Sequence, residues 1–243
     1  MKTNILIVIF SVFFHASCEK SIIFPGDFEP GIALTFDDFW LNINPLMEKY
    51  QAKATFFLTD PLSISQETAE QLRYFQSIGG EVGSHTMHHY DIEDYVDQFG
   101  MNAYIQREVI PSIRLLDSMG LDVSSFAYPY GSIGKNSKRA LLKYFRKIRG
   151  VAGDVENSEE TLVEKLGNFY IQGSFIDQVK KMRLSTIVEA LKKAKRKRAV
   201  LVLVGHLGYP DPKADWNTSI ELVDSIMQYA HENGYKFYRV KDL

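Results

Sequence analysis

The chain has 243 residues, of which 45% are hydrophobic and 24% charged, a composition that excludes intrinsic disorder and collagen-like folds. With 28 Lys and Arg against 30 Asp and Glu, its formal charge of −2 gives no overall field that would attract nucleic acid. The length suits one large core, and we expect a single α/β domain rather than two small ones.

The first seventeen residues are expected to be an export signal. Lys2 precedes an apolar run at 5–14 that is shorter than the ~20 residues needed to span a bilayer and is typical of a secretory signal peptide. The segment His-Ala-Ser-Cys at 15–18 resembles a bacterial lipobox, which predicts that Cys18 is lipidated and anchors the mature chain to a periplasmic or cell-surface membrane. Ordinary signal cleavage nearby, with Cys18 as an idle thiol, is the alternative.

Strands and helices alternate along the rest of the chain, after a linker at 18–30. We expect, in chain order, a strand at 32–36, a helix at 44–50, a strand at 54–58, a helix at 65–77, strand 81–84, helix 101–119, strand 125–128, helix 138–145, strands 147–151 and 169–172, helix 186–195, strand 199–204 and helix 218–233. Ser65 is expected to be an N-cap, and Pro111 predicts a kink. The repeated units predict a barrel-like α/β fold.

Polar residues follow several of these strands directly. Asp37 and Asp38 follow the first strand, a histidine-rich segment at 85–89 follows the third, and Tyr-Pro-Tyr-Gly at 128–131 ends the fourth. His206 follows the last long apolar strand. Because active sites of α/β barrels lie at the carboxyl ends of the strands, we expect these side chains to share one site.

These residue types suit hydrolysis assisted by a metal ion. His85 and His89 are four residues apart, which on a helical turn would place both imidazoles on one face, and a carboxylate would complete a site of two nitrogens and one oxygen. A metal held in this way lowers the pKa of its bound water from ~15.7 towards ~7. One of the adjacent aspartates could bind the metal while the other accepts the water's proton, and His206 could protonate the leaving group.

Each motif also has a purely structural interpretation. A pair of aspartates at a strand end often caps a turn or helix, and neighbouring histidines often bond to the backbone. Tyr-Pro-Tyr-Gly is most simply a turn, and a lone histidine after a buried strand is often a satisfied core residue. Their joint occurrence, in this order, favours a functional site.

Four segments resemble the motifs of the polysaccharide deacetylase, or NodB-homology, family, which is carbohydrate esterase family 4. They are Leu-Thr-Phe-Asp-Asp at 34–38, His-Thr-Met-His-His at 85–89, Phe-Ala-Tyr-Pro-Tyr-Gly at 126–131 and Leu-Val-Gly-His at 203–206. The resemblance implies a distorted (β/α) barrel, with 31–243 as its catalytic domain. It implies removal of acetyl groups from N-acetylated amino sugars or, in some branches, from acetylated sugar hydroxyls.

The resemblance also implies roles by position. Asp37 matches the general base and His206 the general acid, while Asp38, His85 and His89 match the ligands of one divalent metal. We expect Zn²⁺, although two imidazoles and one carboxylate also suit Co²⁺, Ni²⁺ or Fe²⁺.

Further positions around the metal follow from the same resemblance. Thr86 matches the residue that steadies the histidine pair. The backbone N–H of Tyr130 matches a donor to the oxyanion, and Pro129 would hold that turn beside the substrate. His88 is the alternative metal ligand, because its spacing of three residues from His85 would also place it on one helical face.

The chain departs from the family pattern at two places. The family usually carries an arginine where this chain has Ala127, so the partner that would tune Asp37 is missing or comes from elsewhere. The family's fourth motif, which supplies an aspartate to the acid histidine, is not visible between residues 147 and 198. Asp215-Trp216 is similar in composition but follows His206, out of order.

Four aromatic residues are candidates to stack on sugar rings: Trp40, Tyr128, Tyr209 and Trp216. The alternative for each is that its ring closes the core. The basic run at 192–198 could suit an anionic polymer, but it is more typical of the solvated end of a helix.

We therefore expect an exported, metal-dependent hydrolase that acts on carbon–nitrogen bonds of an acetylated polysaccharide or oligosaccharide. One rival is an O-acetyl esterase acting on xylan or a similar glycan. The other is a carbohydrate-binding homologue that keeps the fold and has lost catalysis.

Overall fold

A computed structural model describes residues 29–153, 155, 159–208 and 215–243. The expected signal peptide at 1–17, Cys18, most of the linker at 18–30 and Tyr209 lie outside the described residues. Within the described ranges, no helix is long and apolar enough to cross a bilayer.

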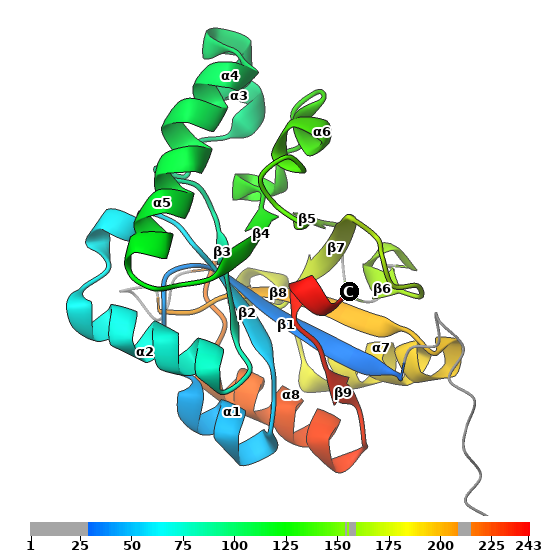
Figure 1. Ribbon diagram of the computed structural model, residues 1–243. Coiled ribbons are helices and arrows are strands. Elements are labelled where there is room, and N and C mark those ends of the chain that lie inside the picture. The colour runs from blue at the N-terminus through cyan, green and yellow to red at the C-terminus, as the bar shows by residue number, and fades with distance from the viewer. Residues whose placement is uncertain (1–28, 154, 156–158, 209–214) are drawn as a thin grey trace, which may run out of the picture.

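Seven parallel strands close into a barrel, as expected for a distorted (β/α) barrel (Figure 1). In barrel order they are β1 (Gly31–Asp38), β2 (Ala54–Leu58), β3 (Glu81–Ser84), β4 (Val123–Ala127), β5 (Lys147–Val151), β7 (Tyr170–Phe175) and β8 (Val200–His206). Pairing of β8 with β1 closes the barrel. Two short strands extend the sheet, the antiparallel β6 (Leu162–Val163) beside β8 and β9 (Lys236–Phe237) beside β1.

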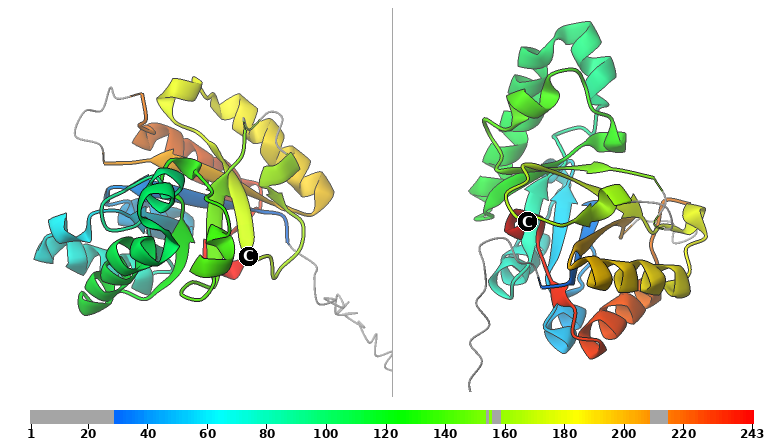
Figure 2. Two further views of the ribbon diagram at one scale, coloured as in Figure 1. Left: turned by 90° about the horizontal axis from the view of Figure 1, so that it is seen from above. Right: turned by 90° about the vertical axis from the view of Figure 1, so that its right-hand side faces the viewer.

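The helices cover the outside of the barrel and extend one end of it. They are α1 (Asn44–Tyr50), α2 (Gln66–Ser77), α3 (Ile92–Phe99), α4 (Met101–Tyr104), α5 (Ile110–Ser118), α6 (Ser137–Leu141), α7 (Leu184–Lys197) and α8 (Ile220–Glu232). Helix α2 packs on β3, α5 on β4 and α7 on β8, while α8 packs between α1 and α7. Figures 1 and 2 show that α3–α5 project at the end of the molecule opposite α1 and α8.

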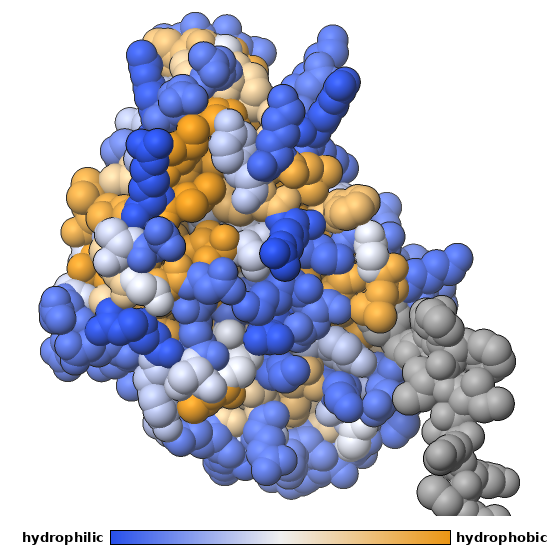
Figure 3. All heavy atoms as spheres, viewed as in Figure 1, coloured by the Kyte–Doolittle hydropathy of each residue, from blue (hydrophilic) through white to orange (hydrophobic). Residues whose placement is uncertain are grey.

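Four of the barrel strands, β1, β2, β3 and β8, are buried at every position. The burial of β1 and β8 arises because β1 lies between β2 and β8 with α7 packed against it. On the face shown in Figure 3, hydrophobic residues gather over α3–α5, while the surface over α1 and α8 is mostly hydrophilic.

Four local predictions differ from the structure. The predicted helix at 101–119 is divided by a π-helical turn (Ile105–Val109), through which the backbone stays helical, and Pro111 lies just after this turn, where it lacks the N–H that would donate to the preceding turn. Helix α3 was not predicted. The strand predicted at 169–172 continues to Phe175, and the helix predicted at 138–145 ends at Leu141.

Candidate active site

Asp37 and Asp38 lie at the carboxyl end of β1, near the centre of the barrel mouth. Both side chains are almost fully buried. Asp38 has a left-handed backbone, with φ of 70°, so the chain turns sharply between the two carboxylates. Such a conformation is costly for a residue with a Cβ, and it is typical of functional sites.

The histidine segment after β3 forms an irregular turn rather than the helical turn assumed from its spacing. Thr86 and His89 have positive φ angles of 75° and 58°. The Thr86 hydroxyl accepts a hydrogen bond from the His89 backbone N–H at 2.9 Å. This bond holds the turn in the form that brings His85 and His89 together, with the imidazole Nε2 atoms 3.2 Å apart.

The three expected metal ligands, Asp38, His85 and His89, lie close together. Asp38 Oδ1 lies 3.2 Å from His89 Nε2 and 3.6 Å from His85 Nε2. Bonds of about 2.0–2.1 Å to a tetrahedral zinc ion would place neighbouring donor atoms about 3.3 Å apart. The three separations fit such a cation, and this trio is the candidate metal cluster among the residues that the structure describes.

The tautomer of His85 also suits metal binding. Its Nδ1 donates to the carbonyl oxygen of Ala127 at 2.9 Å, which leaves the Nε2 lone pair directed at the cluster. Burial, the largest effect, lowers the pKa of His85 to about 4, so the ring is neutral at pH 7, as a ligand must be.

His88, the alternative ligand, lies outside the cluster. Its Nδ1 donates to Oε1 of Glu108 at 2.8 Å, and its backbone N–H donates to Oε2 of the same carboxylate at 2.8 Å. Glu108 belongs to the π-helical turn and is buried. The residue before the ligand His89 is thus held by the π-helical turn between α4 and α5.

Asp37 forms a buried ion pair with Arg149 of β5. Arg149 stands directly beside Ala127 in the parallel register of β4 and β5, so the guanidinium absent from position 127 is supplied one strand away. Burial alone would raise the pKa of Asp37, but Arg149, with His85 and His206, holds that pKa below its ordinary value. The carboxylate is therefore ionised at neutral pH.

His206, at the end of β8, is oriented by Asp177. Its Nδ1 donates to Asp177 Oδ2 at 2.9 Å, and its backbone N–H donates to Asp177 Oδ1 at 2.9 Å. The Thr218 hydroxyl donates to the same oxygen at 2.7 Å. Burial would lower the pKa of His206, but the hydrogen bond to Asp177 and the nearby carboxylates raise it above its ordinary value.

These groups surround one cavity of about 230 Å³. The residues that line it are Asp37, Asp38, His85, His89, Tyr130, Gly131, Phe175, His206 and Trp216. The ring of Tyr130 lies 4.6 Å from that of His89, and Trp216 packs edge-on against Phe175 at 5.2 Å.

Some predicted substrate contacts lie elsewhere. Tyr128 is fully buried and shares a hydrogen bond with Ser137, so its ring belongs to the core and cannot contact substrate. Trp40 packs edge-on against Phe56 at 4.7 Å and likewise does not line the cavity. Pro129 is also buried, in the turn that carries Tyr130.

Arg149 and Asp177 were missed in the sequence, although each leaves a signal there. Arg149 is a charged residue in the middle of an otherwise buried strand, which requires a buried partner. Asp177 lies two residues after the true end of β7. The predicted strand stopped at 172, so the aspartate was not recognised as a strand-end residue.

Comparisons with known proteins found one family model and a number of solved structures that are similar to this chain. Residues 27–145 match the family model described as polysaccharide deacetylase. A peptidoglycan deacetylase from Bacillus subtilis is 21% identical, with a TM-score of 0.57 over 88% of this chain and 89% of that one. A family 4 acetyl xylan esterase from Clostridium thermocellum, solved with a cobalt ion, is 18% identical, with a TM-score of 0.58 over 86% and 88%.

The third similar structure is a family 4 pseudoenzyme from Bacillus anthracis. It is 16% identical, with a TM-score of 0.59 over 88% of this chain and 65% of that one. At these identities the solved structures show a shared fold. No curated protein matches the chain in sequence. The family match, which spans the Asp-Asp and histidine segments, identifies residues 27–145 as polysaccharide deacetylase sequence, and the solved structures share the barrel fold of the chain as a whole.

Proposed function

We propose that this protein is a metal-dependent hydrolase that removes acetyl groups from N-acetylated amino sugars of a polysaccharide or oligosaccharide. One observation carries the proposal: an ionised carboxylate and an oriented histidine flank a candidate metal cluster in a single cavity. These are the groups that hydrolysis of an amide requires, namely a base, an acid and a site for a Lewis acid.

Asp38, His85 and His89 would hold one divalent cation. Zn²⁺ is the first candidate, and Co²⁺, Ni²⁺ and Fe²⁺ suit the same donor atoms. When bound, the cation would polarise the acetyl carbonyl and lower the pKa of water beside it. Thr86 steadies the turn that brings the two imidazoles together.

Asp37 is the proposed general base. Its Oδ1 is engaged by Arg149, whereas Oδ2 lies 3.9 Å from His85 Nε2, on the side of the cluster. Oδ2 is therefore the atom that accepts the proton of the attacking water. The guanidinium keeps the carboxylate ionised and fixes its orientation.

His206 is the proposed general acid. The bond between its Nδ1 and Asp177 leaves Nε2 as the atom that delivers a proton, and Nε2 lies 3.9 Å from Asp38 Oδ2. The raised pKa keeps more of the imidazole protonated near neutral pH. It can then donate to the departing sugar nitrogen.

The turn at Tyr130 is the proposed oxyanion site. Tyr130 has a left-handed backbone, with φ of 58° and ψ of 3°, directly after the buried Pro129. Its peptide N–H would stabilise the charge that develops on the acetyl oxygen, an effect worth about 10²–10³ in rate for such a donor. Trp216, which is 44% exposed, would contact the sugar ring.

Two replacements argue against an impaired homologue. The motif arginine and the motif aspartate are absent from their usual positions, yet Arg149 and Asp177 contact the base and the acid. The proposed base and the proposed acid therefore each keep the charged partner that their roles require. An O-acetyl esterase remains the second candidate, because a similar structure is an acetyl xylan esterase.

Acetate release tests the proposal. The substrates are hexa-N-acetylchitohexaose and acetylated xylohexaose, each with chelated enzyme and with enzyme restored by Zn²⁺ or Co²⁺. We expect metal-dependent release that is faster from the amide substrate. Asp37→Ala should bind metal yet lose nearly all turnover, whereas His85→Ala should lose both. Undiminished release by Asp37→Ala would contradict the assignment, and faster release from the ester would favour the second candidate.

We further propose that the protein acts outside the cytoplasm. The predicted export signal at 1–17 and the lipobox-like segment before Cys18 support this location, and an acetylated cell-surface glycan would be within reach of an anchored domain. Mass spectrometry of the mature N-terminus tests it, since an unmodified Cys18 would exclude the lipid anchor.

A further inference from the structure

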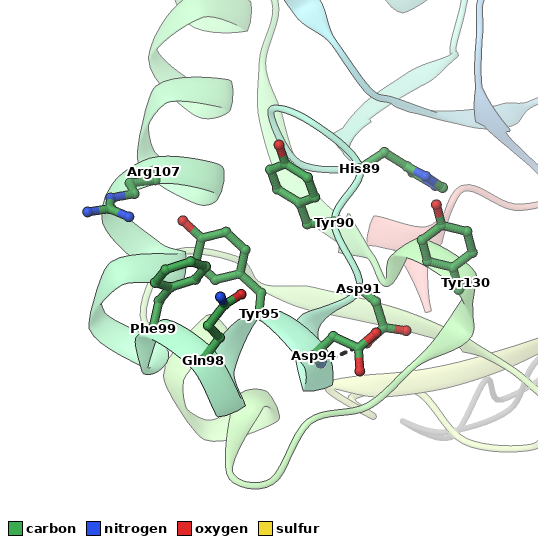
Figure 4. A pocket seen from close by; sticks show the side chains of 9 residues that line it. All are labelled: His89, Tyr90, Asp91, Asp94, Tyr95, Gln98, Phe99, Arg107 and Tyr130. Carbon is green, nitrogen blue, oxygen red and sulfur yellow. Dashed lines mark hydrogen bonds between the residues drawn. The ribbon is translucent and has the colours of Figure 1, made fainter.

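A second, larger cavity adjoins the catalytic cavity. It has a volume of about 750 Å³ and lies between the histidine turn and helices α3–α5. His89 and Tyr130 line both cavities, so the two meet at this pair of rings. In Figure 4 these two residues lie at one end of the cavity, and Phe99 and Arg107 lie at the other.

Aromatic rings continue from the catalytic cavity into this space. Tyr90 lies 5.5 Å from Tyr95, and Tyr95 lies 5.0 Å from Phe99, measured between ring centroids. Tyr95 and Phe99 are four residues apart on α3 and therefore share one face of that helix. Tyr90 and Phe99 are each 50% exposed, so their rings present apolar surface on which a ligand could pack.

The cavity is held rigidly in place relative to the catalytic turn. Asp91 caps α3 by accepting a hydrogen bond from the Glu93 backbone N–H at 2.8 Å. The same carboxylate oxygen accepts from the Ser132 hydroxyl at 2.9 Å, two residues after Tyr130. The aromatic face of α3 is thus tied to the loop that carries the proposed oxyanion donor.

The polar lining suits the hydroxyl groups of an uncharged sugar. Asp91 and Asp94 offer carboxylate acceptors, and Gln98 offers both a donor and an acceptor. Arg107 is the only lysine or arginine among the described residues that line the cavity, with its guanidinium carbon 5.8 Å from the Phe99 ring. Two carboxylates against one guanidinium favour neutral or amino sugars over uronic acids.

We propose that this cavity is an outer subsite, which binds a neighbouring sugar ring of a neutral glycan chain while the acetylated sugar lies in the catalytic cavity. The inference rests on the proposed function and goes beyond it by fixing the substrate as a chain and by placing its direction, from His89 and Tyr130 towards Phe99. The apolar faces of pyranose rings would pack on Tyr90, Tyr95 and Phe99, and their hydroxyl groups would bond to the polar lining.

Binding of sugars of different length tests the subsite. The full chain carries Asp37→Asn, so that substrate persists, and binding of N-acetylglucosamine and of hexa-N-acetylchitohexaose is followed by NMR titration. The hexamer should bind far more tightly than the monomer. Adding Phe99→Ala should weaken hexamer binding about tenfold, the effect of one stacked ring, and change monomer binding by less than about twofold.

Matched variants separate loss of the subsite from loss of the fold. Phe99→Trp should keep the tighter hexamer binding, because it keeps a ring. Phe169→Ala removes an aromatic side chain that is 65% exposed just before β7, at the opposite end of the barrel, and should leave hexamer binding unchanged. Hexamer binding that is equal in Phe99→Ala and the parent protein would overturn the inference. Equal binding of a hexagalacturonate would overturn the neutral-sugar assignment.

The experiment distinguishes failure of the subsite from failure of the proposed function. Ring-dependent hexamer binding without acetate release from any substrate would support the subsite and refute the deacetylase. Acetate release that does not depend on chain length or on Phe99 would support the deacetylase and refute the subsite.

Discussion

Replacing Arg149 by methionine would remove the cation that keeps Asp37 ionised while leaving the barrel packed. Both side chains are buried, and the guanidinium is the largest of the influences that lower the pKa of Asp37. An arginine beside an aspartate lowers the aspartate's pKa by about 1–3 units, which at 1.36 kcal/mol per unit is about 1.4–4 kcal/mol. Breaking a buried ion pair costs a similar amount, about 3–5 kcal/mol.

The loss of stability should depend on pH in a defined direction. In the wild type the lowered pKa of Asp37 contributes stability above the ordinary value of about 3.9, and this is lost as the pH falls through the lower folded pKa. In Arg149→Met burial would act without the cation and raise the pKa. The variant should therefore be least stable, relative to the wild type, at neutral pH and approach it below about pH 4.

Thermal unfolding at pH 7 and pH 4, together with a pH–activity profile, measures both consequences. A loss of about 3 kcal/mol corresponds to a Tm about 6–12 °C lower at pH 7 for a domain of this size. The acid limb of activity should move up by about 1–3 pH units, because the base must be ionised. An unchanged Tm at pH 7 and an unchanged acid limb would refute the reasoning.

The neighbouring strand offers a matched control. Ala127 is fully buried beside Arg149, so Ala127→Arg alone would place two cations in one buried site and should destabilise the fold. Combining Ala127→Arg with Arg149→Ala moves the single cation to the position that the family uses. The double variant should be more stable than either single variant, and simple additivity of the two losses would contradict this.

Three further changes test other parts of the site. Asp177→Asn should move the basic limb of activity to lower pH, because the anion that raises the pKa of His206 is lost. The raised pKa contributes stability below about pH 6.5, and this stability disappears as the pH rises through the folded pKa. The Tm of the variant should therefore fall further below that of the wild type at pH 5.5 than at pH 9. Glu108→Gln should weaken zinc binding about 10–100-fold in a calorimetric titration, because Glu108 accepts two hydrogen bonds from the ligand turn; unchanged affinity would exclude this role. Gly83→Ala should lower the Tm by about 2–12 °C through overpacking, since its Cβ would lie 2.5 Å from a phenylalanine ring, whereas Gly153→Ala, with open space around it, should not.

The strands, and most residues at their ends, could be predicted because their signals are local. Strands 32–36 and 54–58 are short apolar runs, and Asp37 and Asp38 follow the first of them directly. A buried parallel strand needs only its own sequence to be recognised. The predicted metal ligands also lie close together, although not for the predicted reason. The histidine segment folds through two positive φ angles, at Thr86 and His89, and not through a helical turn.

The partners of the base and the acid could not be predicted, because each depends on packing between distant strands. The Asp37–Arg149 pair joins residues 112 positions apart, and which strand supplies the cation is decided by the register of β4 and β5. Asp177 was not recognised because the predicted strand ended at 172, whereas β7 ends at Phe175. Helix α3 could have been predicted, because Asp91 is a typical N-cap and the apolar residues at 92, 95, 96 and 99 follow helical spacing.

The pairing of β1 with β8 also determines when the candidate active site forms during folding. It joins residues far apart in the chain, as in the hydrogen bond from the Thr35 hydroxyl to the Leu203 carbonyl at 2.8 Å, across 168 positions. Contacts of such high sequence separation form late and slow the search for the native state. The carboxylates of β1 and the imidazole of His206 come close together only when β1 pairs with β8. Closure of the barrel therefore also completes the candidate active site. A nascent or truncated chain without β8 would have an incomplete site and an unpaired strand edge that is prone to aggregation.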